Sequence, residues 1–144
     1  MKPQRKNQSD FVFFKNYETR WRDNDVYNHV NNAVFYEYDD SIVNYWLLES
    51  GALKLPHGPI IGLVVETKCN YFAPLKFPRS IVCGLALNEK GHSAVNYSIG
   101  LFEKENTAAS AQASLIHVYV DSKTRRPVPL PFELVEALKS LENV

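Results

Sequence analysis

The sequence predicts an α+β fold in which one long helix packs on a largely antiparallel sheet of about five strands. Apolar residues recur at helical spacing over one long segment, at about residues 32–49. Between residues 60 and 120, apolar runs with strand character alternate with short turns. Because one helix cannot be the crossover for many parallel strands, neighbouring strands are expected to pair in antiparallel fashion.

The N-terminal half is predicted to contain the first strand and the helix. The strand is expected at 13–21, a segment rich in aromatic residues. Asn31 or Asn32 suits the N-cap of the helix, because an Asn side-chain oxygen accepts a hydrogen bond from an unpaired backbone N–H. The helix is expected to run to about Glu49 and to end at Gly51. Its apolar stripe consists of Val34, Phe35, Tyr38, Ile42, Tyr45 and Trp46.

The remaining strands follow a loop that contains two prolines. They are predicted at 60–72, 79–88, 92–102 and 108–120, and a short terminal helix is predicted at 132–141. The whole chain, 1–144, is expected to be one domain, with residues 1–10 as a polar tail. Apolar residues also lie on the sheet face away from the helix, which indicates that a second subunit covers it.

Composition excludes several classes of protein. The chain has 144 residues and a formal net charge of zero, whereas a general nucleic-acid binder usually carries a basic excess. No apolar run reaches the roughly 18 residues of a membrane span, and no secretory signal is visible, so a cytoplasmic location is expected. Cys69 and Cys83 lack zinc-site spacing and are predicted to be buried free thiols. Neither a metal nor a cofactor is expected.

Polar residues concentrate in 23–33, directly before the helix. This segment reads Asp-Asn-Asp-Val-Tyr-Asn-His-Val-Asn-Asn-Ala and holds two carboxylates, one imidazole and several carboxamides. The first turn of a helix offers unpaired N–H groups and the positive end of the helix dipole. Such a position attracts anions, so the segment predicts a catalytic site at the start of the helix.

The same segment resembles the hotdog-fold acyl-CoA thioesterases, specifically the 4-hydroxybenzoyl-CoA thioesterase family. The resemblance rests on Arg22-Asp23-Asn24-Asp25, His29-Val30-Asn31-Asn32-Ala33 and Tyr36, and it extends to 64–75 and 121–131. It implies a long helix wrapped by a curved antiparallel sheet. It also implies a homodimer or homotetramer with the active site at the dimer interface, and hydrolysis of an acyl-CoA to a free acid and coenzyme A.

The resemblance assigns roles within the motif. Asp25 corresponds to the catalytic carboxylate, and the backbone N–H groups of Asn31 and Asn32 would hold the thioester carbonyl. The chemistry agrees, because thioester hydrolysis needs a nucleophile or a base together with donors for the developing oxyanion. Asp23 is predicted to be structural. For His29 two interpretations stay open: a residue that orients Asp25 or contacts the thioester, and a packed histidine at the start of the helix.

Two positions depart from the family pattern. Asn28 stands where many relatives have glycine, and asparagine tolerates positive φ better than most residues. Asp39 and Asp40 stand where relatives often carry paired glutamates. The spacing of Asp39 from Phe35 indicates that it faces inward, so it is a second candidate for the catalytic carboxylate, or else a buried carboxylate that organises the interface.

The resemblance also suggests substrate contacts. Glu66 and Lys68 belong to the strand expected near the pantetheine arm, although Glu66 also suits a cross-strand pair. Arg125 and Arg126 are the first candidates for contacts with the coenzyme A phosphates. The aromatic residues expected around the acyl group are Tyr27, Phe35, Tyr36, Trp46 and Phe72.

Two other functions fit the same residues. One is hydrolysis of an acyl group from an acyl carrier protein, and the other is a non-catalytic hotdog domain that binds an acyl thioester or acts as a scaffold. The sequence leaves open the length of the acyl chain, its aromatic or aliphatic character, and the choice between dimer and tetramer.

Overall fold

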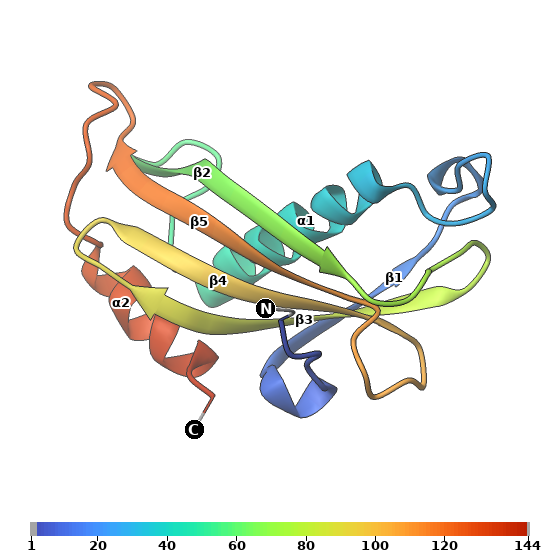
Figure 1. Cartoon of the computed structure of the whole chain (residues 1–144). Coiled ribbons are helices and arrows are strands. Elements are labelled where there is room, and N and C mark those ends of the chain that lie inside the picture. Colours follow the sequence, from blue (N-terminus) through green and yellow to red (C-terminus); the bar gives the residue numbers. More distant parts are fainter. Residues whose placement is uncertain (1–2, 144) are drawn as a thin grey trace.

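The computed structural model describes residues 3–143 and confirms the predicted architecture. In this part of the chain, five strands form one antiparallel sheet with the order β1-β3-β4-β5-β2, and α1 lies across one face of it (Figure 1). The strands are β1 (Phe13–Glu18), β2 (Ile60–Tyr71), β3 (Ser80–Lys90), β4 (Ala94–Glu103) and β5 (Ala111–Asp121), and the helices are α1 (Asn32–Ser50) and α2 (Phe132–Leu138).

The ends of α1 form as the sequence predicts. Ala33 N donates to Asn31 Oδ1 at 2.9 Å, which makes Asn31 the N-cap, and Gly51 ends the helix with a φ of 69°. The apolar stripe is displaced slightly from the predicted one, because Tyr45 is exposed and Val43 and Leu47 are buried in its place. The buried face comprises Phe35, Tyr38, Asp39, Ile42, Val43, Trp46 and Leu47.

The core lies between α1 and the inner face of the sheet. Alternate residues of β4 point toward the helix and are fully buried; they are Val95, Tyr97, Ile99 and Leu101. The rings of Trp46 and Tyr97 meet edge to face, with centroids 5.9 Å apart. This contact joins the C-terminal half of α1 to the centre of the sheet.

Three predicted elements were too long, and one of them, the strand predicted at 108–120, begins only at Ala111. The first strand ends at Glu18 instead of Trp21, and a 3-10 turn at Trp21–Asp23 follows it. The turn forms because Arg20 N donates to the Asp23 carboxylate at 2.8 Å, which draws the chain out of the sheet. The terminal helix likewise ends at Leu138 and continues as a 3-10 turn, Lys139–Leu141.

The N-terminal segment, predicted only as a polar tail, is held against the outer face of the sheet. Figure 1 shows the segment from residue 3 to β1 on the side of the sheet opposite α1. Phe11, only 4% exposed, packs over Gly84 and Gly100, and its ring meets Phe102 edge to face with centroids 5.8 Å apart. The protein therefore covers part of the outer apolar face with its own chain, where a second subunit had been expected.

The opposite edge of the sheet is open. β2 is the last strand in the sheet and pairs only with β5 within the described residues. Its register shifts between Val64 and Glu66, and the side chain of Val65 is 59% exposed. A long edge strand with exposed apolar residues is a pairing surface for another strand.

A substitution at Gly100 tests whether the Phe11 ring packs against the outer face of the sheet. A Cβ added there would lie 2.6 Å from Phe11 Cε2 and 2.8 Å from Phe102 Cε2. Gly100→Ala is therefore expected to displace the Phe11 ring and to lower the free energy of unfolding by about 1–3 kcal/mol, measured by urea denaturation. Gly91→Ala is the control, because its nearest neighbour is Ala94 O at 4.0 Å. Equal stability of the two variants would contradict the proposed packing.

Candidate active site

The polar segment before α1 folds into a small hairpin. Asn24 and Val30 form an antiparallel bridge, and Asp25 N donates to His29 O at 2.8 Å. Asn28 N donates to Asp25 O at 3.1 Å and closes the turn, with Asn28 at a φ of 65°. The left-handed conformation expected for Asn28 is thus confirmed. The hairpin places the backbone of Asp25 directly opposite His29.

Backbone hydrogen bonds fix this hairpin to the turn between β2 and β3. Val30 N donates to Leu75 O at 2.7 Å, and Phe77 N donates to Asn24 Oδ1 at 3.0 Å. From the end of β2, Tyr71 Oη donates to Asn32 O at 3.3 Å. The motif, the start of α1 and the C-terminal end of β2 therefore form one connected unit.

Asp23 has the structural role predicted for it. Its buried carboxylate accepts hydrogen bonds from Arg20 N, Arg20 Nε and Tyr38 Oη at 2.8, 3.1 and 2.9 Å. Burial alone would raise the pKa of Asp23, but the hydrogen bonds from Arg20 and Tyr38 outweigh it and hold the pKa below its ordinary value. A carboxylate with all of these bonds is a fixed anchor.

The carboxylate of Asp25 accepts fewer hydrogen bonds than that of Asp23. Its Oδ1 accepts a hydrogen bond from Tyr27 N at 2.8 Å, and its Oδ2 accepts none from residues 3–143. The side chain is half-buried. One carboxylate oxygen is thus held by the turn while the other is available to a reactant.

A hollow of about 300 Å³ lies at the start of α1 beside the hairpin. It brings together His29 and Asn32 with Phe35 and Phe72, which were expected among the aromatic residues around the acyl group. Its other walls are Val30, Tyr71, Ala73 and Pro74, which belong to segments that carry the family resemblance but had no individual role assigned.

The backbone donors at the helix start are not equivalent. Asn31 N donates to Asp23 O at 2.8 Å, so the N–H group of Asn31 is already engaged, contrary to its predicted role at the thioester carbonyl. Asn32 N has no acceptor among the described residues. Of the two predicted donors, Asn32 is therefore the free one, and it belongs to a residue that lines the hollow.

Asp39 faces inward as predicted, and no hydrogen bond compensates its burial. It is 1% exposed, and neither carboxylate oxygen has a partner in the described chain. Burial, with a smaller contribution from Asp40, raises the pKa of Asp39 to about 8. Burial raises the pKa of both Cys69 and Cys83, and Asp39 adds a smaller electrostatic contribution, so this carboxylate lies within electrostatic reach of both thiols. Both cysteines are free; Cys83 is buried as predicted, whereas Cys69 is only partly buried.

The other predicted substrate residues lie outside the hollow. Tyr27 is 77% exposed at the tip of the hairpin, and Tyr36 lies on the exposed side of α1. Glu66 and Lys68 pair with Ile116 and Ser114, on the outer face of the sheet. Arg125 and Arg126 follow β5 at the far end of the sheet, away from the motif (Figure 1). β5 has 11 residues, which corresponds to about 35 Å at about 3.3 Å per residue.

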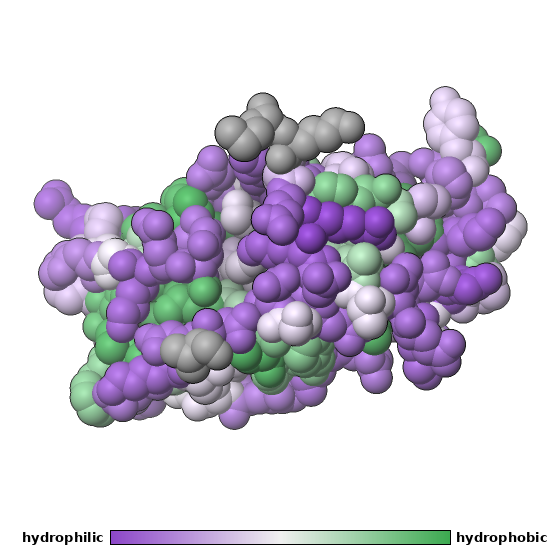
Figure 2. Space-filling model, turned by 60° about the horizontal axis from the view of Figure 1, so that its bottom comes forward, coloured by the Kyte–Doolittle hydropathy of each residue, from purple (hydrophilic) through white to green (hydrophobic). Residues whose placement is uncertain are grey.

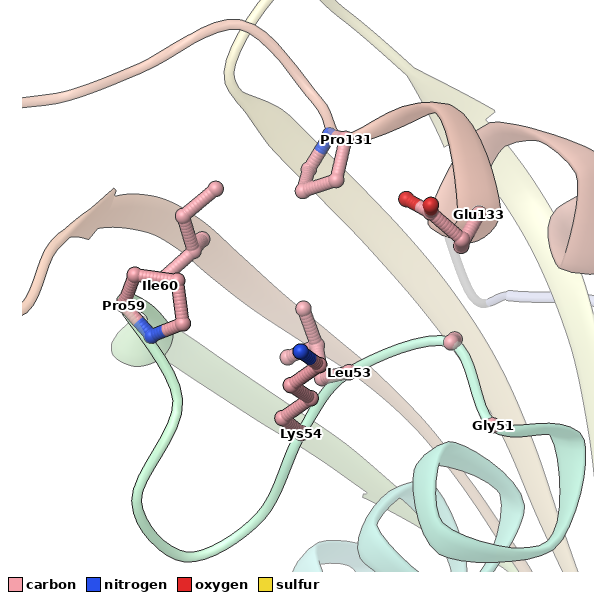
Figure 3. A pocket seen from close by; sticks show the side chains of 8 residues that line it. Gly51, Leu53, Lys54, Pro59, Ile60, Pro131 and Glu133 are labelled. Carbon is pink, nitrogen blue, oxygen red and sulfur yellow. The ribbon is translucent and has the colours of Figure 1, made fainter.

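A second hollow, of about 290 Å³, lies at the C-terminal end of α1. Three segments line it, namely 51–54 after the helix, Pro59 and Ile60 at the start of β2, and Pro131 and Glu133 at the start of α2 (Figure 3). It holds one lysine, Lys54, and one glutamate among apolar side chains. It contains none of the motif residues, so it is separate from the catalytic candidates.

A five-stranded antiparallel sheet curved around one long helix, with a polar hairpin at the helix start, defines a hotdog-fold protein. Residues 19–138 match the thioesterase-like superfamily, and the chain belongs to this superfamily. The narrower assignment to the 4-hydroxybenzoyl-CoA thioesterases stays a prediction. The sequence has no match among curated proteins.

Solved structures share the whole fold. The PA5185 protein from Pseudomonas aeruginosa strain PAO1 is 41% identical, with a TM-score of 0.93 over 96% of this chain and 97% of that one. Slr0204, a 1,4-dihydroxy-2-naphthoyl-CoA thioesterase from Synechocystis, has a TM-score of 0.81 at 20% identity, over 90% and 96% of the two chains. SAV2348 from Staphylococcus aureus, solved in complex with CoA, has a TM-score of 0.82 at 14% identity, over 92% and 86%.

Among residues 3–143, no helix is long and apolar enough to cross a membrane. The same residues contain no group of three or more His, Cys, Asp or Glu side chains arranged to hold a metal ion.

The raised pKa of Asp39 predicts a pH-dependent stability. Between the unfolded pKa of about 4 and the folded pKa of about 8, the folded state binds the extra proton, so this group's contribution to stability falls as pH rises. Asp39→Asn is expected to gain stability over the unaltered protein with increasing pH, by up to about 1.4 kcal/mol per pH unit, and to level off near pH 8.

Urea denaturation at pH 5, 6, 7 and 8, at one protein concentration, measures this difference. Asp40→Asn is the control, because Asp40 is the exposed neighbour of Asp39 on α1. Parallel pH profiles of the unaltered protein and Asp39→Asn would show that Asp39 titrates normally.

Proposed function

We propose that this protein hydrolyses acyl-CoA thioesters, with Asp25 as the catalytic carboxylate. The observation that carries the proposal is the pairing of Asp25 with His29 across the hairpin, since His29 lines the same hollow as Asn32. A carboxylate with one uncommitted oxygen and a free helix-start N–H thus belong to one small unit. Membership of the thioesterase-like superfamily supports this chemistry.

The reaction needs an attack on the thioester carbonyl carbon and stabilisation of the oxyanion that forms. Asn32 N supplies a donor without any side chain, and the positive end of the α1 dipole adds to it. Asp25 acts either as the base that takes a proton from water or as the nucleophile that forms an anhydride, which water then opens. In both routes the C–S bond breaks and the products are a carboxylic acid and the thiol of coenzyme A.

His29 and Asp39 have different places in this scheme. The His29 side chain is exposed at the rim of the hollow, where it meets the substrate or the attacking water. Asp39 is enclosed in the core and favours the neutral form, so we assign it to the core beneath the site and keep Asp25 as the carboxylate of the reaction.

The open edge of β2 supports a homodimer with a shared active site. In a two-fold symmetric pair that extends the sheet, two copies of β2 run antiparallel. The Tyr71 end of one strand then lies toward the Ile60 end of the other. This arrangement brings the partner subunit's Arg125 and the partner subunit's Arg126 toward the hollow, whereas those of the same chain lie at the far end. Further pairing into a tetramer fits the same scheme.

Two alternatives differ from acyl-CoA hydrolysis in a measurable way. An acyl carrier protein presents the same thioester without a nucleotide, and a binding or scaffold domain has no turnover. The CoA complex of SAV2348 favours coenzyme A as the carrier of the thioester here. The reaction as proposed uses no metal and no cofactor, and we place it in the cytoplasm.

Asp25→Asn tests the catalytic role. Asparagine keeps the side-chain oxygen that accepts from Tyr27 N but has neither the charge nor the basicity of the carboxylate. Turnover is expected to fall at least about 100-fold while coenzyme A binding is retained. The measurement is thiol release from a panel of short, long and aromatic acyl-CoAs.

Asp121→Asn is the matched control. Asp121 Oδ1 accepts hydrogen bonds from Lys123 N and Thr124 N at 2.8 and 2.9 Å, so it stabilises a turn as Asp25 does, at the other end of the sheet. Its substitution is expected to leave turnover unchanged. The absence of thiol release by the unaltered protein across the whole panel would rule out the hydrolase.

A further inference from the structure

Two further hollows lie next to the one at the start of α1, around the C-terminal end of β2. The nearer of the two is lined by Pro3, Asn70, Tyr71 and Phe72, and it shares Tyr71 and Phe72 with the hollow at the start of α1. The farther one, on the outer face of the sheet, shares Pro3 and Asn70 with the nearer one. We refer to these three adjacent hollows together as the groove; they follow one another from the inner to the outer side of the sheet.

The outer end of this groove is a polar basin of about 330 Å³. Register places its floor on one face of the sheet, because Lys68 pairs with Ser114 and Ser114 pairs with Ser98. The basin has two ammonium groups and no carboxylate in its lining, which comprises Pro3, Lys6, Lys68, Asn70, Asn88, Ser98, Gln112, Ala113 and Ser114. Figure 2 shows a surface on which hydrophilic residues predominate, interrupted by hydrophobic patches.

The N-terminal segment builds one side of this basin and is fixed there. Lys6 N donates to Gln112 Oε1 at 2.8 Å, and Ala109 N donates to Lys6 O at 2.9 Å. Gln112 Nε2 in turn donates to Gln4 O at 2.9 Å. Lys6 Nζ donates to Ser98 Oγ at 2.9 Å, so its ammonium group is held over the outer face.

The two lysines are available to an anion. Neither Lys6 nor Lys68 belongs to any of the ion pairs formed within residues 3–143. The closest acidic residue on the same face of β2 is Glu66, two positions before Lys68, and it does not line the basin. Two unpaired ammonium groups among serine and amide donors form a phosphate-binding arrangement.

We propose that this groove holds the coenzyme A portion of the substrate, with the nucleotide phosphates bound by Lys6 and Lys68 on the outer face of the sheet. The proposal rests on the proposed thioesterase function. Coenzyme A has a reactive sulfur at one end, a linear arm, and phosphates at the other end. The groove has the same order: the helix start, a passage past Phe72 and Asn70, and the two lysines. Within a single chain, Lys6 and Lys68 lie nearer to the hollow at the start of α1 than Arg125 and Arg126 do.

Binding of coenzyme A, 3′-dephospho-coenzyme A and pantetheine by titration calorimetry tests the proposal without any turnover. Lys68→Ala is the cleaner variant, because the Lys68 side chain makes no hydrogen bond in the described structure. Lys6→Gln removes the charge of Lys6 but retains a donor for Ser98 Oγ. Each substitution is expected to weaken coenzyme A binding about tenfold and to leave pantetheine binding unchanged. Higher salt is expected to weaken coenzyme A binding to the unaltered protein more than to the double variant.

Lys139→Ala is the control, because Lys139 pairs with Glu136 on the exposed C-terminal segment, away from the groove. Equal coenzyme A affinity of the unaltered protein and the two groove variants would place the phosphates elsewhere and overturn the proposal. So would a coenzyme A affinity no higher than that of pantetheine, or no binding at all. Thiol release from acyl-CoAs is measured separately, so a phosphate site elsewhere is distinguished from the absence of hydrolysis.

Discussion

The buried carboxylate of Asp23 is the contact on which the geometry of the site depends. Its side chain binds Arg20 and Tyr38, and its backbone oxygen accepts a hydrogen bond from Asn31 N. One residue thereby joins the end of β1, the middle of α1 and the N-cap of α1. Because Asp23 occupies the N–H group of Asn31, the donor left free at the helix start is that of Asn32.

The outer face of the sheet and its β2 edge differ in how their apolar residues are covered. On the outer face, Phe11 packs over two glycines and closes a small cluster that includes Phe102. At the edge, β2 keeps unpaired backbone groups and exposed valines. Packing of the N-terminal segment also brings Lys6 to the outer face. The uncovered edge of β2 is available to another copy of the chain.

The core contains polar groups of two kinds. The hydroxyls of Tyr97 and Tyr119 are hydrogen-bonded at 2.7 Å, and His117 Nδ1 lies 3.1 Å from Tyr119 Oη. These three buried side chains therefore provide hydrogen-bond partners for one another. Burial lowers the pKa of His117 to about 4, which keeps it neutral near pH 7. Asp39 has no such partner, and its raised pKa is the physical response to that isolation. The two cases are different responses to burial: hydrogen bonding among neighbouring side chains around Tyr119, and a shift of the pKa toward the neutral form for Asp39.

The sequence by itself determined the elements and the location of the motif, since these depend on local patterns. The spacing of apolar residues gave α1, Asn31 and Gly51 gave its ends, and Asn28 gave the left-handed turn. Only the tertiary structure decided which groups are engaged, because hydrogen bonds such as that from Asn31 N to Asp23 O and the cover of Phe11 over Gly100 join segments whose contact has no local signature. For the same reason the sequence did not indicate the groove as a whole, although the family resemblance placed Lys68 near the pantetheine arm. The walls of the groove come from 3–6, 29–35, 68–74, 88, 98 and 112–114, and they meet only in the folded chain.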